Sequence, residues 1–263
     1  MLPVRQPQNL TAQAAREPNR ACDHRSVLQR LGRLLVALAL VGTTCAVLPA
    51  QASAPSARVA RVAEPPWAQQ LPAGTTQVVR TVSSHQYCRR VWCTLTQAWE
   101  RADDGTWTKV REFRSTIGVH GWGKRREGDG RSPVGVFRIK VTFTTTTSNP
   151  GEMPWRQRRA TSIVSASAGP NYNTWLEVPG VTSGDRPSMR SGWVVDYNRV
   201  RLHPGVGPRP VPGRGSGIFF HTSKPGHRWA PTAGCTQVGN PRQMRWLLTW
   251  LRPDAQPRVV QDL

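Results

Sequence analysis

Two side chains in the last fifth of the sequence have the types that nucleophilic catalysis needs. His221 ends an apolar run, 218–220, and Cys235 follows fourteen residues later, directly after Gly234. A thiol attacks as its thiolate, and an unperturbed cysteine is only slightly ionised near neutral pH. A neighbouring histidine has the pKa best suited to removing that proton. The pair therefore indicates acyl transfer through a cysteine nucleophile.

The glycine before the cysteine adds to this hypothesis. Gly234 permits a sharp turn, so that the thiol and nearby backbone N–H groups face one carbonyl and form an oxyanion hole. The same residue types also occur as a buried structural cysteine and a core histidine. The spacing of His221 and Cys235 by itself leaves both interpretations open.

The N-terminal residues 1–52 have the pattern of a secretory signal peptide. Arg25, Arg30 and Arg33 precede an apolar run at 34–48, and a small-residue cleavage pattern closes the segment. The run is shorter than the roughly 20 apolar residues that span a bilayer. A cleaved signal is therefore favoured over an uncleaved anchor. We expect export, with the mature chain extracellular or in the cell envelope.

The chain is strongly basic, with a net charge of +21. The predicted signal peptide contains six basic and two acidic residues, so cleavage leaves +17. Such a charge attracts polyanions, and export excludes cytoplasmic nucleic acid as the partner. Anionic polymers of a bacterial envelope are then the favoured partners. An Arg-rich, solvated surface without a partner is the alternative interpretation.

Three of the five cysteines remain after the predicted cleavage. Cys88 and Cys93 bracket four residues, a spacing that suits a disulfide across a tight turn in an oxidising compartment. Cys235 is then left over. A leftover cysteine in an exported protein indicates either an intermolecular pair or a free reactive thiol.

The elements that must position these side chains are mostly strands. Residues 53–74 are rich in Pro and Ala and predict a linker, and 75–263 predict one domain. Alternating and β-branched segments predict strands at 77–82, 93–99, 107–113, 136–147, 192–197 and 217–221.

One clear helix is expected near the C-terminus. Asn240 is a suitable N-cap and Pro241 a suitable first residue, and the helix ends before Pro253. Its apolar face consists of Met244, Leu247, Leu248 and Leu251. The fold class is therefore mainly β with a few helices.

The segment around Cys235 resembles the catalytic motif of the L,D-transpeptidases, the YkuD-type catalytic domain of bacterial cell-wall enzymes. In that motif a histidine after an apolar strand precedes Ser/Thr-x-Gly-Cys, and 232–235 reads TAGC. Similar segments occur upstream in the family's order: GVHG at 118–121, EGDGRSPVGVF at 127–137, DYN at 196–198 and GSGIF at 215–219. The resemblance covers about 75–260 and implies a mixed β-sheet sandwich.

By position, the resemblance implies that Cys235 is the nucleophile and His221 the base, with the ring oriented by the backbone carbonyl of Thr222. The N–H groups of Gly234 and Cys235 would form the oxyanion hole. The candidate substrate-binding residues are Tyr197, Asn198, Trp229, Thr232 and Gln237.

The chain departs from the family's common pattern at two positions. Ala233 stands where the family often has His, and Gln237 stands where it often has Arg or Asn. The second departure concerns contacts with the substrate more than the nucleophile.

The resemblance also implies a reaction on peptidoglycan. The cysteine attacks the carbonyl of the third residue of a tetrapeptide stem, expels the terminal D-Ala and forms a thioester. The amine of a neighbouring stem then makes a 3→3 cross-link, or water completes an L,D-carboxypeptidase reaction. The family is characteristically acylated by carbapenems. Neither metal nor nucleotide is required.

Other interpretations are weaker. His227 lies between His221 and Cys235, but the spacing matches no common zinc site, so we expect no metal. In the Gly-rich segment around Glu127 and Asp129, turn capping is favoured over acid–base catalysis. The alternative function is a non-catalytic cationic module that binds the cell wall. An exported thiol protease of another fold lacks a local signature.

Overall fold

The computed structural model describes residues 64–180 and 186–263. The predicted signal peptide, 1–52, lies outside these residues, as does 53–63 of the predicted linker. Within the described ranges, no helix has the length and apolar character needed to cross a membrane.

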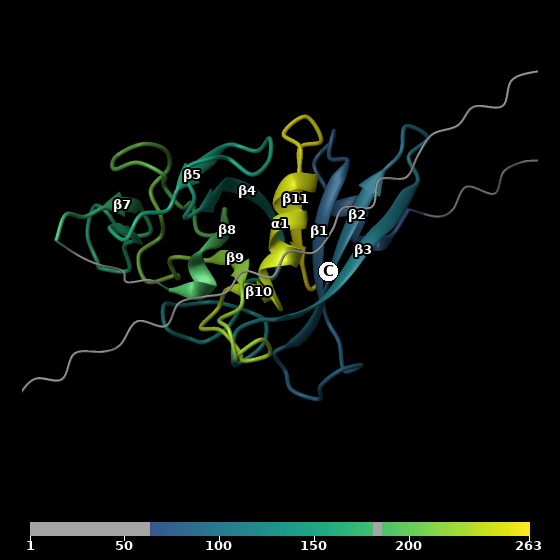
Figure 1. Cartoon of the computed structure of the whole chain (residues 1–263), viewed down its shortest axis with the longest axis horizontal. Coiled ribbons are helices and arrows are strands. Elements are labelled where there is room, and N and C mark those ends of the chain that lie inside the picture. Colours follow the sequence, from purple (N-terminus) through teal and green to yellow (C-terminus); the bar gives the residue numbers. More distant parts are fainter. Residues whose placement is uncertain (1–63, 181–185) are drawn as a thin grey trace, which may run out of the picture. The chain divides into compact units, whose positions relative to one another are not determined.

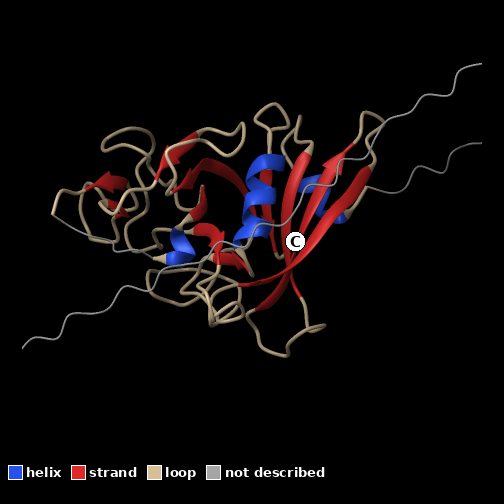
Figure 2. Ribbon diagram, viewed as in Figure 1, coloured by secondary structure: helices blue, strands red, loops and turns tan. Residues whose placement is uncertain are grey.

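Strands dominate the described residues, as Figure 2 shows. The strands are β1 (Gln77–Ser83), β2 (Cys93–Arg101), β3 (Trp107–Thr116), β4 (Gly135–Thr144), β5 (Trp155–Gln157), β6 (Ser162–Val164), β7 (Trp175–Glu177), β8 (Ser191–Val195), β9 (Phe219–Thr222), β10 (Thr236–Val238) and β11 (Arg258–Gln261). The helices are the 3₁₀ turns η1 (Pro66–Gln70) and η2 (Pro187–Met189) and the α-helix α1 (Pro241–Trp250).

Nine strands form one sheet in the order β11-β1-β2-β3-β10-β9-β8-β4-β5. Val259 of β11 pairs with Val79 of β1 in parallel and with Phe137 of β4 antiparallel. Because one residue meets partners on both sides, the sheet closes on itself through β11. The mainly β fold predicted from the sequence is confirmed, and β11 is the strand that completes it.

The helix α1 packs against the inner face of this closed sheet (Figure 1). The side chain of Asn240 accepts the N–H of Gln243 at 3.0 Å, and Pro241 occupies the first turn, as predicted. The predicted apolar face is fully buried in one core cluster with residues of β1–β3, β8 and β9. The helix therefore holds the β1–β3 part of the sheet against the part that carries His221.

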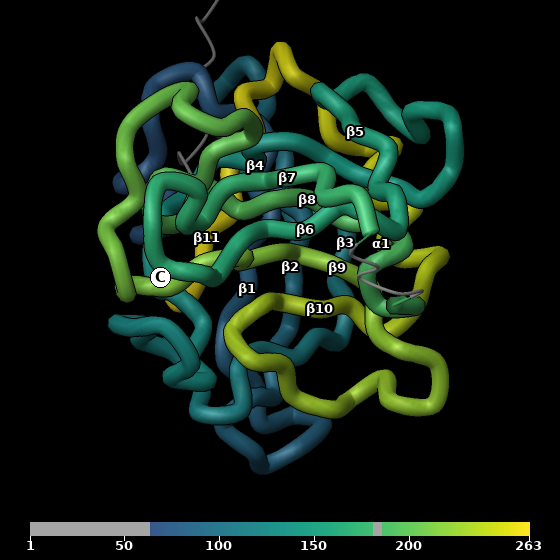
Figure 3. Tube along the Cα trace, turned by 90° about the vertical axis from the view of Figure 1, so that its left-hand side faces the viewer, coloured from purple at the N-terminus to yellow at the C-terminus, as the bar shows by residue number. Residues whose placement is uncertain are grey.

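A short hairpin, β6–β7, lies over the other face of β8 and β9 (Figure 3). Trp175 of β7 packs against Phe143 of β4, with ring centroids 5.9 Å apart. Val194 of β8 and Phe219 of β9 belong to the same apolar cluster. Both faces of the sheet are thus covered near β9, which places the functional strand between two apolar layers.

The predicted linker at 53–74 is wrong in its C-terminal part. Pro66–Gln70 form η1, and the Trp67 side chain is only 5% exposed. Its ring lies 5.4 Å from that of Trp99 and 5.2 Å from that of Trp107. Pro and Ala composition favoured a linker, but burial of one large aromatic ring outweighs that preference. The folded domain therefore begins before residue 75.

Replacement of Trp67 tests this boundary. We expect Trp67→Ala to lower the free energy of unfolding by about 3 kcal/mol, because it empties a buried aromatic site. Chemical denaturation followed by circular dichroism measures the change. Trp229→Ala is the matched control, since that side chain is 44% exposed. If both substitutions lowered the free energy of unfolding by the same small amount, η1 would belong to the linker and not to the folded domain.

Candidate active site

The parallel pairing of β9 with β10 places the predicted nucleophile. Thr236 pairs with Phe220 and Gln237 with His221, so Cys235 enters the sheet beside Phe219. The Cys235 Sγ accepts the N–H of Phe219 at 3.4 Å and lies 3.5 Å from the carbonyl oxygen of Gly217. Two chain segments far apart in sequence thus meet at the sulfur.

His221 lies on the same face of β9 as Phe219, because side chains two apart share a face of a strand. Phe220, between them, points to the core and stacks on Trp193 with centroids 4.2 Å apart. The Nδ1 of His221 is 2.7 Å from the carbonyl oxygen of Thr222, which agrees with the orienting role expected of Thr222.

The ionisation of both groups is governed by burial. Burial lowers the pKa of the His221 ring, and hydrogen bonds to the backbone of Thr222 and Ser188 counter part of that change. Burial raises the pKa of the Cys235 thiol to about 11, against the opposing effects of the Phe219 N–H and the Lys124 ammonium. The resting pair is therefore a neutral imidazole and a protonated thiol. No hydrogen bond joins the two side chains in the described part of the chain.

Two hydroxyl groups hold the turn that carries Cys235. The Ser132 hydroxyl donates to the carbonyl of Gly234 at 2.8 Å and accepts the N–H of Gly118 at 3.0 Å. The Thr232 hydroxyl accepts the N–H of Gly234 at 3.1 Å and donates to the carbonyl of Cys235 at 2.5 Å. The peptide between Gly234 and Cys235 is therefore fixed from both sides.

The two N–H groups of the predicted oxyanion hole differ in this arrangement. The N–H of Gly234 is donated to the Thr232 hydroxyl. The N–H of Cys235 has no partner among the described residues and remains available. Thr232, expected to contact substrate, supports the turn, and its contact with substrate stays a prediction. The sequence could not show this, because the hydrogen bond depends on the turn's three-dimensional path.

Gly234 is required at this position for a second reason. Its φ is +144°, and a Cβ there would lie 2.8 Å from the carbonyl oxygen of Arg131. Any side chain would push the turn away from the segment that contains Ser132.

A buried ion pair lies beneath the same turn. The Lys124 ammonium is 3.0 Å from Oδ1 of Asp129, and the two side chains are 2% and 9% exposed. Asp129 also accepts the backbone N–H groups of Arg125, Arg126 and Arg131, which confirms the expected turn capping. These hydrogen bonds hold the pKa of Asp129 well below its usual range, although burial opposes them. Sequence analysis assigned no role to Lys124 or Ser132.

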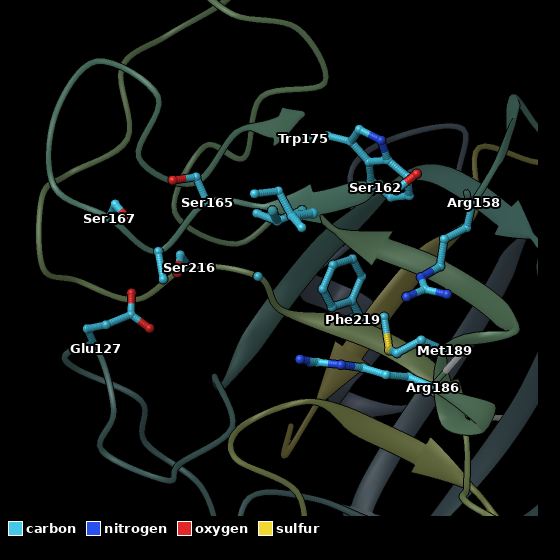
Figure 4. Close-up of a pocket in the computed structure, with 14 residues that line it drawn as sticks. Glu127, Arg158, Ser162, Ser165, Ser167, Trp175, Arg186, Met189, Ser216 and Phe219 are labelled. Carbon is cyan, nitrogen blue, oxygen red and sulfur yellow. The ribbon is translucent and has the colours of Figure 1, made fainter. Parts of the chain in front are cut away.

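A cavity of about 510 Å³ is lined by Gly217 and Phe219, whose backbone atoms contact the sulfur, but neither Cys235 nor His221 lines it (Figure 4). The Glu127 carboxylate lies at one end, near Ser216, and accepts the Tyr172 hydroxyl at 2.6 Å. Arg158 and Arg186 lie at the other end beside Met189. The cavity therefore presents opposite charges at its two ends.

Two other candidate substrate residues have structural contacts instead. Tyr197 is buried, and its hydroxyl donates to the carbonyl of Arg214 at 3.0 Å. The Asn198 side chain donates to Val211 and Gly215 and accepts the N–H of Val211. Both residues fasten the 211–215 loop next to the cavity rather than line it.

The remaining candidates do not line this cavity either. Gln237 is buried, and its side chain donates to the carbonyl of Ala230 at 2.7 Å. Trp229 is partly exposed, with the Arg114 guanidinium 5.8 Å from its ring centroid. His227 is exposed on the loop between β9 and β10.

The other cysteines and possible metal ligands are also placed by the structure. Cys88 and Cys93 are joined in a disulfide, with Cα atoms 5.9 Å apart, and Cys235 is free. Among the described residues, no group of three or more His, Cys, Asp or Glu side chains is arranged to hold a metal ion.

Comparison with protein families matches residues 94–260 to YkuD, the L,D-transpeptidase catalytic domain. The chain belongs to this family. The matched range contains His221, Cys235, Ser132 and the Lys124–Asp129 pair, and it begins in β2 and ends in β11. Membership supports a catalytic function of the L,D-transpeptidase type; the family in general acts on peptidoglycan peptides and is sensitive to carbapenems. No curated protein matches the chain.

The raised pKa of Cys235 predicts slow alkylation of the native thiol. At pH 8.5 we expect iodoacetamide to modify native Cys235 more slowly than the urea-unfolded chain, because unfolding restores an ordinary thiol pKa near 8.5. The native rate should still rise with pH beyond pH 10. Intact-mass analysis of protein that starts at residue 53 follows a single addition, because Cys22 and Cys45 are then absent and Cys88 and Cys93 form the disulfide. A native rate that levels off below pH 8 would contradict the raised pKa.

Replacement of Ser132 tests the support of the turn. Ser132→Ala removes the donor to Gly234 and should slow acylation of Cys235 by a carbapenem about tenfold, since the Cys235 N–H is no longer held in place. Ser167→Ala is the matched control, because Ser167 lines the same cavity and is exposed. An unchanged acylation rate in folded Ser132→Ala would contradict this role.

Proposed function

We propose that this protein is an exported L,D-transpeptidase that cross-links peptidoglycan stem peptides through a Cys235 thioester. The observation that carries the proposal is the contact of Cys235 Sγ with the strand that carries His221, beside the unpaired N–H of Cys235 itself. Family membership supports the chemistry, and the 3→3 linkage is the finer assignment that we add.

The first half-reaction forms the thioester. The Cys235 sulfur attacks the carbonyl carbon of the third stem residue, and the thiol proton passes to His221. The N–H of Cys235 donates to the negative oxygen of the tetrahedral intermediate. The bond to D-Ala then breaks, and His221 returns the proton to the departing amine.

The second half-reaction releases the enzyme. The side-chain amine of a neighbouring stem attacks the thioester and loses a proton to His221, and the sulfur leaves as a thiol. The product is a 3→3 cross-link. When water is the attacking group, the same site acts as an L,D-carboxypeptidase. Cys235 and His221 act in both half-reactions.

Burial sets the resting protonation states and opposes the transfer of the thiol proton. The lowered pKa of His221 keeps the ring neutral and able to accept a proton, and the raised pKa of Cys235 keeps the thiol protected until a substrate is bound. Ionisation of the sulfur therefore needs a group near it that stabilises negative charge.

The cavity suits a stem peptide, which carries both carboxylates and an amine. Its Arg158 and Arg186 end is suited to a stem carboxylate, and its Glu127 end to an amine. We place the stem along this axis, with the scissile carbonyl beside Gly217 and Phe219.

Export is part of the proposal. The pattern of residues 1–52 supports a signal peptide, and the Cys88–Cys93 disulfide supports an oxidising compartment. The net charge of +17 after cleavage supports attraction to anionic wall polymers.

The deciding experiment is intact-mass analysis of the protein incubated with a carbapenem. We expect one adduct per chain in the wild type, none in Cys235→Ala and slow formation in His221→Ala. Exchange of stem tetrapeptides should likewise be absent in Cys235→Ala and slow in His221→Ala. Melting curves of the variants serve as the control for folding.

The alternative function predicts a different result. A non-catalytic wall-binding module would form no adduct when well folded, and its binding to cell walls would weaken steeply with salt and ignore Cys235→Ala. Stem trimming that persists in Cys235→Ala would also contradict our proposal.

A further inference from the structure

The Lys124 side chain is an ammonium group enclosed in the protein. It extends from the segment after β3, and its side chain is 2% exposed. A charge in such a place is costly unless it is paired and hydrogen-bonded. Two of its three N–H donors reach the Asp129 carboxylate at 3.0 Å and the carbonyl oxygen of Arg126 at 3.2 Å. The third has no partner among the described residues.

The position of this ammonium is set by the nucleophile's own turn. A Cβ built on Gly234 would lie 3.6 Å from Nζ of Lys124, and one on Gly215 would lie 2.4 Å from its Cε. The Lys124 side chain therefore runs between the glycine loop that leads into β9 and the glycine that precedes Cys235. No side chain separates the charge from the Gly234–Cys235 backbone.

Asp129 holds the ammonium in place and moderates its charge. Its carboxylate accepts three backbone N–H groups in addition to Lys124, so its own position does not depend on the lysine. The pair is therefore a fixed dipole whose positive end lies toward the turn of Cys235.

The thiolate needs such a charge. Cys235 is partly buried, and the described residues supply one backbone N–H to its sulfur, at 3.4 Å, and no hydrogen bond from His221. A positive charge near a thiol favours its ionised form, and the effect grows where less water surrounds the two groups. The direction of the Lys124 effect on the pKa of Cys235 agrees, because it lowers that pKa.

We propose that Lys124 stabilises the negative charge that develops on the Cys235 sulfur, and that Asp129 positions Lys124 and limits its effect. This inference rests on the proposed role of Cys235 as nucleophile. Lys124 acts through its field on the sulfur and does not exchange protons with it.

Other titratable or charged groups lie on the elements around the site. His221 lies on β9, and Glu127, Arg158 and Arg186 line the cavity. Because none of these groups is altered in the experiment below, their contribution is the same in every variant.

The test compares Lys124→Met, Asp129→Asn and the double variant with the wild type. The rate of Cys235 alkylation by iodoacetamide, an uncharged reagent, is measured by intact mass between pH 7 and 9. Loss of Lys124 should raise the thiol pKa by about one unit and slow alkylation about threefold at fixed pH, since higher nucleophilicity offsets part of the lost ionisation. Asp129→Asn should speed it by a similar factor. The double variant should lie between the two single variants.

The decisive result is that the two single substitutions change the alkylation rate in opposite directions. Both single substitutions break the same ion pair, so a purely structural role would move the two rates the same way. Lys109→Met is the matched control for loss of a lysine, because Lys109 is exposed on β3 and pairs with Glu112. Its alkylation profile should match the wild type. If Lys124→Met does not fold, the comparison of Asp129→Asn with the double variant remains, and Asp129→Asn should be alkylated faster.

Single variants that fold and change in the same direction, or not at all, would overturn the inference. The proposed function fails differently: no carbapenem adduct on the wild type would contradict it, even where the alkylation order holds. The carbapenem therefore tests the proposed function, and iodoacetamide tests the role of Lys124.

Discussion

The site depends on the parallel pairing of two short strands, β9 and β10. With Thr236 opposite Phe220, Cys235 enters the sheet next to the strand of His221, although thirteen residues separate them in the sequence. The loop between the strands returns along the 117–119 segment, where Thr232 exchanges backbone hydrogen bonds with Ile117 and Val119. A parallel pair needs such a crossover, and here the crossover itself supports the nucleophile.

Around this pairing, polar groups fix the orientation of the Cys235 turn, which apolar packing does not determine. The core on one face and the β6–β7 hairpin on the other place β9 rigidly but provide no direction for the thiol. Ser132 and Thr232 fix the peptide before Cys235 by hydrogen bonds that are satisfied on both sides. Burial makes a free thiolate costly, and the Lys124–Asp129 pair supplies a fixed charge where the solvent does not reach. The hydrogen bonds of Ser132 and Thr232 and the Lys124–Asp129 ion pair therefore affect both the stability of the turn and the reactivity of Cys235.

The long elements could be predicted from local patterns. The strands β1, β2 and β3 alternate or carry β-branched residues over seven to ten positions, and α1 has an N-cap, a proline and an apolar face. The strands β5, β6, β7 and β10 have three residues each, too few for a period to be recognised. They form because a neighbouring strand pairs with them. The Pro/Ala-rich segment around Trp67 was misassigned for a related reason: its partners, Trp99 and Trp107, are distant in sequence.

The sequence by itself determined the chemical types: a cysteine after a glycine, a histidine after an apolar run and the ordered motifs of one family. It also determined the α1 cap and the predominance of strands, because these depend on neighbouring residues. Only the tertiary structure decided that the Gly234 N–H is occupied, that Tyr197 and Asn198 fasten a loop and that Lys124 lies beneath the nucleophile. The physical reason is common to these cases. A hydrogen bond or a buried charge takes its partner from whichever segment the folded sheet brings near, and that choice is not encoded in local spacing.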